Sequence, residues 1–126
     1  MSNIKNILNE ISNNFIKLST QSIPQIENAI DIILYSLKNN GKIMFCGNGG
    51  SAADSQHLSA ELVGRYLKNR KPLPSVSLTT DTSIITAISN DFSFDEIFSR
   101  QVEAIGKSED VLYAISTSGK SKNIIT

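Results

Sequence analysis

The sequence is short of cysteine, tryptophan and net charge. Its 126 residues include one cysteine, one histidine, three prolines and no tryptophan, and its 12 acidic residues balance its 12 basic ones. A single cysteine excludes an intrachain disulfide and is typical of a reducing compartment. Zero net charge provides no general attraction to nucleic acid or to acidic membranes. We therefore expect a cytoplasmic protein whose partners include neither nucleic acid nor a membrane.

Long apolar runs are also missing. No uninterrupted apolar segment reaches the ~18 residues that span a bilayer, and the N-terminus lacks the basic-then-apolar pattern of a secretory signal. The length fits one domain or part of one. Cys46 ends a short apolar run, which favours a buried small side chain over a reactive thiol.

Helical spacing of apolar residues predicts two leading helices, over residues 2–18 and 25–38. The first stripe packs either on a neighbouring subunit or on the chain's own core. The second stripe is wide enough to predict deep burial. We expect Gly41 to end the second helix in a left-handed conformation.

Short apolar runs predict three strands, at 42–46, 75–78 and 111–115, with helices between them that include one over 94–105. The last run predicts a buried strand. This alternation predicts an α/β fold with a doubly wound parallel sheet covered on both faces. Residues 1–40 would be an N-terminal helical segment and residues 41–126 the front of the sheet domain. Three strands are few for such a sheet, so the chain reads as C-terminally truncated.

A glycine turn follows the first strand. Residues 47–52 read GNGGSA, which formally fits the dinucleotide fingerprint G-x-G-x-x-A. No acidic residue at the end of the second strand is placed to hold a ribose, which counts against a dinucleotide. Two other interpretations stay open: a tight turn that uses glycine for geometry alone, and an anion site at a helix N-terminus.

A hydroxyl-rich loop follows the third strand. Residues 114–121 read AISTSGKS, a Walker A pattern with Ala114 in place of the first glycine. The missing glycine makes nucleotide hydrolysis a poor fit, whereas hydroxyls and backbone N–H groups suit a phosphate monoester. An ordinary capped loop is the other interpretation. Both loops leave the carboxyl ends of parallel strands, so we expect them to meet over one site.

Two further pairs of polar residues are candidates for the functional site. His57 and Glu61 lie four residues apart on the helix after the glycine turn, so they share a face and can share a metal. A packed histidine and a solvated glutamate would also explain them. Asn90 and Asp91 interrupt a later helix and are either a wall of the site or a helix end.

Several motifs occur in the order found in one known family. The segments CGNGGSAADSQHLSAELVGRY, LTTDTS, ISNDFSFDEIFSRQVEA and DVLYAISTSGKS lie within residues 41–121. They resemble the phosphoheptose isomerases of the sugar isomerase (SIS) domain superfamily. The resemblance implies an α-β-α sandwich and an aldose–ketose isomerase that converts sedoheptulose 7-phosphate to D-glycero-D-manno-heptose 7-phosphate through an enediolate, for heptose and surface glycan biosynthesis. It also implies a homotetramer with sites built between subunits.

The resemblance also implies roles for individual residues. Glu61 would be the catalytic acid or base, and with His57 it would hold zinc. The family's further metal ligands, a Gln and a His, have no counterpart here, so the zinc site would be incomplete in this chain. The sugar phosphate would be bound by Glu61 together with Asn48, Gly49, Gly50, Ser51, Asn90, Asp91, Ser116, Thr117, Ser118 and Ser121.

A protein without catalysis is the alternative. It would be a SIS regulator of the DnaA initiator-associating type, or a SIS module that senses a sugar phosphate. The regulator type lacks the carboxylate at the position of Glu61, and its glycine turn is altered. Glu61 and the intact run Gly49-Gly50-Ser51 therefore favour the isomerase.

Overall fold

The computed structural model describes residues 2–126, which divide into two compact units between Leu34 and Tyr35. The first unit contains α1 (Ser2–Gln21) and most of α2 (Ile23–Lys38). The structure leaves the apolar stripe of α2 exposed rather than deeply buried; Ile30, for example, is 49% exposed. An apolar stripe is buried only where another surface covers it. None of the described helices is both long enough and apolar enough to cross a membrane.

Helix α2 ends with the 6→1 hydrogen bond that is typical of a Schellman motif. The backbone N–H of Gly41 donates to the Ser36 carbonyl at 2.9 Å. The left-handed residue is Asn40, with φ 61°, so the prediction for Gly41 was wrong; asparagine tolerates this conformation. Gly41 is needed for a different reason. A Cβ atom there would lie 2.2 Å from the Glu109 carbonyl oxygen and 2.4 Å from Ser36 Oγ.

The second unit is built on a parallel sheet with the strand order β2-β1-β3. The strands are β1 (Ile43–Gly47), β2 (Ser75–Ser77) and β3 (Val111–Ile115). In the register of the sheet, Ile43 is paired with Ser75 on one side and with Val111 on the other. The predicted parallel α/β sheet is thus confirmed.

Helices connect these strands. Helix α3 (Gly50–Val63) links β1 to β2, and a short α6 (Lys122–Ile125) follows β3. Three elements link β2 to β3: α4 (Thr82–Asp91), the 3-10 helix η1 (Phe94–Glu96) and α5 (Ser99–Ile105). The single helix predicted over 94–105 is therefore broken. The break falls at Ile97 and Phe98, which are only 2% and 4% exposed, so core packing overrides local helix propensity there.

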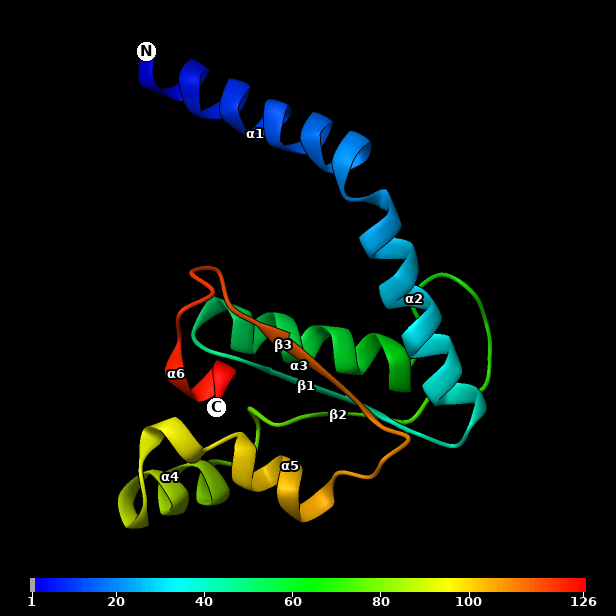
Figure 1. Cartoon of the computed structure of the whole chain (residues 1–126), viewed down its shortest axis with the longest axis vertical. Coiled ribbons are helices and arrows are strands. Elements are labelled where there is room, and N and C mark those ends of the chain that lie inside the picture. The colour runs from blue at the N-terminus through cyan, green and yellow to red at the C-terminus, as the bar shows by residue number, and fades with distance from the viewer. Residues whose placement is uncertain (1) are drawn as a thin grey trace. The chain divides into compact units, whose positions relative to one another are not determined.

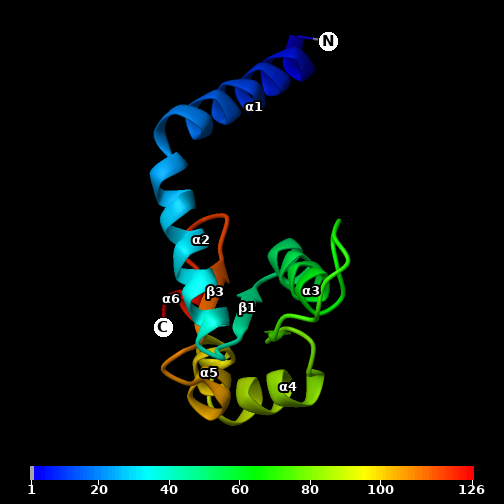
Figure 2. The ribbon, with the colours of Figure 1, turned by 90° about the vertical axis from the view of Figure 1, so that its right-hand side faces the viewer.

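Side chains alternate across the sheet along β1. Met44 and Cys46 join Leu78, Ile97 and Phe98 in a buried cluster. Helices α4 and α5 lie on that side of β1, and α3 lies on the other (Figures 1 and 2). Cys46 is 1% exposed, and this burial raises the pKa of its thiol to about 11. The expectation of a buried cysteine is confirmed.

Strand β3 is less buried than predicted. Leu112 and Tyr113 are 41% and 42% exposed. Within residues 2–126, β3 pairs only with β1, so its outer edge has no neighbouring strand. Toward β1 the strand is packed: the rings of Phe45 on β1 and Tyr113 on β3 lie with their centroids 5.4 Å apart.

Asp110 joins the starts of β1 and β3. Its carboxylate accepts hydrogen bonds from the backbone N–H of Lys42 at 2.8 Å and of Lys107 at 2.9 Å, and it pairs with the Lys42 ammonium. Desolvation by burial alone would raise the pKa of Asp110, but these hydrogen bonds and the charge of Lys42 outweigh it and lower the pKa below 3.8. The carboxylate thereby joins β1 and β3 at their N-terminal ends. The candidate site lies at the opposite, carboxyl ends of the same two strands.

Candidate functional site

The candidate site lies where the order of the strands reverses. The chain passes from β1 outward to β2 and then returns to β3 on the opposite side of β1. In open α/β sheets, ligands bind at the carboxyl ends of the strands at such a reversal. The glycine turn (residues 47–51) leaves β1 there, and the serine loop (residues 116–121) leaves β3 there (Figure 1).

The two loops meet around one cavity of about 170 Å³. No acidic or basic side chain lines it, and most of its lining groups are hydroxyls and an amide. Such a lining suits an oxyanion, because it offers hydrogen-bond donors without a repelling carboxylate. The lining residues are Asn48, Ser51, Ile115, Ser116, Thr117, Ser118 and Ser121.

The serine loop holds its hydroxyls in a useful arrangement. The N–H of Gly119 donates to Ser116 Oγ at 3.1 Å, and the N–H of Lys120 donates to Ser118 Oγ at 3.2 Å. The Oγ atoms of Ser116 and Ser121 lie 3.3 Å apart. A hydroxyl that accepts a hydrogen bond keeps its own proton to donate. These side chains can therefore bind an anion while they hold the loop in shape.

The glycine turn leads directly into α3. Gly49 has φ 56°, a conformation that residues with a Cβ atom rarely adopt. No side chain caps the N-terminus of α3. The N–H of Ser51 donates to the Asn48 carbonyl and that of Ala52 to the Gly49 carbonyl, while the positive end of the helix dipole lies at this turn.

His57 and Glu61 share one face of α3, as predicted. His57 Nε2 lies 3.6 Å from Glu61 Oε1, which is too long for a hydrogen bond. The imidazole is 74% exposed and the Glu61 side chain 30% exposed. Glu61 Oε2 is shielded from solvent and has no hydrogen-bond partner. A shielded oxygen without a partner is unusual enough to call for a ligand, a proton or a metal at this position.

The donor types fit zinc, but their number is too small. Imidazole nitrogen and carboxylate oxygen are both common zinc ligands, and protein zinc sites normally have three or four protein ligands. Within residues 2–126, no group of three His, Cys, Asp or Glu side chains is placed to hold a metal ion. His57 and Glu61 therefore supply two donors of an incomplete set.

Helix α3 separates this pair from the cavity. At 1.5 Å of rise per residue, His57 lies about 9 Å and Glu61 about 15 Å along the helix axis from Ser51. Figure 1 shows α3 running back along the sheet, away from the two loops. Neither His57 nor Glu61 lines the loop cavity. The structure thus brings Asn48 and Ser51 together with the hydroxyls of the serine loop. Gly49, Gly50 and the predicted acid–base residue Glu61 are not among the lining residues.

Asn90 and Asp91 are the last two residues of α4. Asn90 Nδ2 donates to Asp91 Oδ1 at 2.8 Å. Asp91 lines a different hollow of about 350 Å³ between α4 and α5, whose other lining residues are mostly apolar. Both residues lie outside the loop cavity, so their contact with a substrate stays a prediction.

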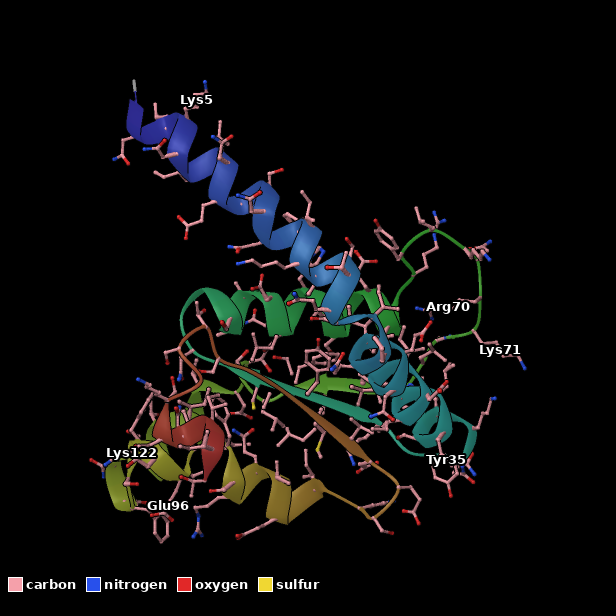
Figure 3. All side chains as sticks on the ribbon, turned by 45° about the horizontal axis from the view of Figure 1, so that its top comes forward. Lys5, Tyr35, Arg70, Lys71, Glu96 and Lys122 are labelled. Carbon is pink, nitrogen blue, oxygen red and sulfur yellow. The ribbon has the colours of Figure 1, made fainter. Side chains whose placement is uncertain are left out.

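Two residues of interest gave no signal in the sequence analysis. Asn123 on α6 is 5% exposed and hydrogen-bonds the side chain of Asn48. Arg70 extends from the loop after α3 (Figure 3) and donates to the carbonyls of Glu61 and Leu62, at 2.7 and 2.9 Å. It therefore holds the end of the helix that carries Glu61.

With this geometry established, similarity to known proteins identifies the family. Residues 7–126 match the family model described as the SIS domain. The chain belongs to the SIS domain family. The resemblance found in the sequence motifs is thereby confirmed, as is the fold that it implied.

Named relatives of this SIS domain are phosphoheptose isomerases. The enzyme of Rhodospirillum rubrum is 59% identical over 111 residues, which cover 88% of this chain and 58% of the relative. The enzyme of Helicobacter pylori is 52% identical over 111 residues, covering 87% and 58%. Both comparisons reach little more than half of the relative's length.

Solved structures agree. A phosphoheptose isomerase from Neisseria gonorrhoeae superimposes with a TM-score of 0.89 at 44% identity, covering 98% of this chain and 64% of that one. A phosphoheptose isomerase from Francisella tularensis gives a TM-score of 0.92 at 35% identity, covering 98% and 65%. The chain thus spans 58% to 65% of the length of these relatives.

Proposed function

We propose that the protein containing this chain is an aldose–ketose isomerase that converts sedoheptulose 7-phosphate to D-glycero-D-manno-heptose 7-phosphate for heptose and surface glycan biosynthesis. The observation that carries the proposal is the hydroxyl-lined cavity between the glycine turn and the serine loop. It suits the phosphate group of such a sugar. The similarity to phosphoheptose isomerases over most of the chain supports the same class of reaction.

Glu61 is the proposed base. Isomerisation requires a proton to leave the carbon beside the carbonyl and a proton to return to the neighbouring carbon, with an enediolate between. Glu61 Oε2 has no hydrogen-bond partner and is shielded from solvent, so it is free to accept that proton. A phosphate fixed in the cavity anchors the far end of the sugar and orients the reacting carbons.

Zinc is part of the proposal. His57 Nε2 and Glu61 Oε1 would hold it, which leaves Glu61 Oε2 for the proton. The bound metal supplies stabilisation of the negative charge that develops on a substrate oxygen. No third His, Cys, Asp or Glu side chain among residues 2–126 is placed to complete the set with this pair.

We also propose that the working site is shared between subunits of a homotetramer in the cytoplasm. The substrate must touch the phosphate cavity and the base together, yet Glu61 lies about 15 Å along α3 from Ser51. A Glu61 from a neighbouring copy would remove this conflict. The one cysteine is a free, buried thiol, which agrees with a reducing compartment.

The test is Glu61→Gln in the full-length gene product, with sedoheptulose 7-phosphate as substrate. Loss of the base should lower kcat by a factor of about 10² to 10⁴, while binding of the sugar phosphate persists. Glu103→Gln removes an exposed carboxylate on α5 and should leave kcat unchanged. Wild-type turnover by Glu61→Gln would refute the catalytic assignment.

Mixed oligomers extend the same test to the assembly. Ser118→Glu places a carboxylate in the phosphate cavity and should abolish binding of the sugar phosphate. If each site takes Glu61 from one subunit and the cavity from another, mixing this variant with Glu61→Gln restores some intact sites and part of the activity. Activity that stays at the level of the separate variants would show that each subunit carries its own complete site.

A further inference from the structure

Asn123 is a buried polar residue with an unusual partner. It lies on α6 directly after the serine loop and is 5% exposed. Asn48 Nδ2 donates to Asn123 Oδ1, and Asn123 Nδ2 donates to Asn48 Oδ1, each at 2.8 Å. Two side chains 75 residues apart in the sequence thus form a closed, reciprocal pair of hydrogen bonds.

The pair fixes the amide of Asn48. A side-chain amide has two N–H donors and two lone pairs on its oxygen. The reciprocal pair uses one donor and one oxygen of each residue, so neither amide can rotate without losing both bonds. Asn48 lines the loop cavity, whereas Asn123 does not. Asn123 can therefore act on a ligand only through Asn48.

A purely local role for Asn123 does not explain these contacts. Asparagine often caps a helix or a turn by bonding to the nearby backbone. Here both side-chain hydrogen bonds of Asn123 go to Asn48, and the N-cap residue of α6 is Ser121, without a side-chain cap. The pair instead connects the glycine turn, whose Asn48 lines the cavity, to the segment that follows the serine loop.

We propose that Asn123 is a positioning residue for anion binding. Its amide, paired with that of Asn48, holds the glycine turn and the serine loop at the separation at which one phosphate group contacts both. The proposal deepens the proposed function, because it concerns the phosphate part of that site. It requires only the described cavity, and neither Glu61 nor a metal takes part.

The first test uses the wild-type chain and inorganic phosphate as the probe. Phosphate is titrated while the side-chain NH₂ signals of Asn48 and Asn123 are followed by ¹H–¹⁵N NMR. Both pairs of signals should shift with the same Kd, although Asn123 does not line the cavity. Signals of Asn123 that stay fixed while those of Asn48 move would overturn the proposal. So would the absence of phosphate binding by the wild type.

The second test compares variants under the same titration. Asn123→Ala removes both hydrogen bonds and should raise the phosphate Kd about tenfold, the upper range for such bonds. Asn123→Asp keeps one bond, sets an oxygen against Asn48 Oδ1 and adds a negative charge near the anion, so its Kd should rise further. Asn69→Asp adds the same charge on the exposed loop after α3 and should stay within about twofold of the wild type.

A double-mutant cycle separates positioning from general damage. In an Asn48→Ala background, Asn123→Ala should have no further effect on the phosphate Kd, because its route to the cavity is gone. Equal effects of Asn123→Ala in both backgrounds would overturn the proposal. Isomerase activity is not the readout, so an inactive enzyme would count against the proposed function while the coupling between the two amides still decides this inference.

Discussion

Gly47 and Gly50 of the glycine turn should respond to alanine in opposite ways. A Cβ atom on Gly50 would have no heavy atom within 4 Å, and Gly50 is the first residue of α3. Alanine is favoured over glycine in a helix by up to about 1 kcal/mol. A Cβ atom on Gly47 would lie 2.6 Å from the Ser51 carbonyl oxygen, which forces the backbone to move and costs about 1–3 kcal/mol.

The two substitutions should therefore affect different properties: Gly47→Ala the stability of the fold, and Gly50→Ala the affinity for the ligand. Gly50→Ala should keep or slightly raise Tm, whereas Gly47→Ala should lower it by roughly 3–5 °C per kcal/mol lost. If the sugar phosphate contacts the backbone at Gly50, the added methyl group occupies its place. The Kd for sedoheptulose 7-phosphate in Gly50→Ala should then rise at least about tenfold, which corresponds to 1.4 kcal/mol.

Thermal unfolding and isothermal calorimetry on the same samples test both parts. Wild-type affinity in Gly50→Ala would refute the assignment of Gly50 to the substrate. A loss of stability in that variant would refute the inference that a methyl group fits beside Gly50 without a clash. Gly47→Ala is the matched control, because the same methyl group three positions earlier should act on the fold.

Two predictions concern the supports of the site. Because the pKa of Asp110 is lowered in the folded chain, its carboxylate stabilises the fold above the unfolded value near 3.9, and this stability is lost as pH falls through the folded pKa. In urea unfolding from pH 6 to pH 2, the free energy of unfolding should fall less steeply for Asp110→Asn than for the wild type. An equal fall in both proteins would contradict this role of Asp110. Arg70→Met removes the hydrogen bonds to Glu61 and Leu62 and should cost about 1 kcal/mol, with faster amide exchange at the end of α3; unchanged exchange would show that Arg70 does not hold that end.

The sheet and the meeting of its two loops could be predicted because both follow from general rules. Short apolar runs separated by helices favour parallel strands, and ligands gather at the carboxyl ends of those strands. The rules act on the backbone, so they place the glycine turn beside the serine loop without knowledge of any side chain. They also place His57 and Glu61 on one face of α3, since that depends only on helical spacing.

Features that depend on particular contacts could not be predicted. The pairing of Asn123 with Asn48 requires the register between β1 and β3, which no local pattern specifies. The left-handed conformation predicted for Gly41 falls on Asn40 instead, and Gly41 is required by its close packing against Glu109, which is not visible in the sequence. The exposed side chains of β3 were missed for a related reason: an apolar run looks the same at the edge of a sheet as at its centre.

The separation along α3 has a consequence for how the two halves of the site depend on assembly. The proposed phosphate binding would use groups that one copy of the chain already brings together, held by the Asn48–Asn123 pair and by the strands that Asp110 joins. Proton transfer in the proposed reaction would use Glu61, which the same copy keeps about 15 Å from Ser51 along the helix. Dilution that separates subunits should therefore abolish turnover before it abolishes phosphate binding. A simultaneous loss of both would mean that the cavity, too, depends on a neighbouring copy.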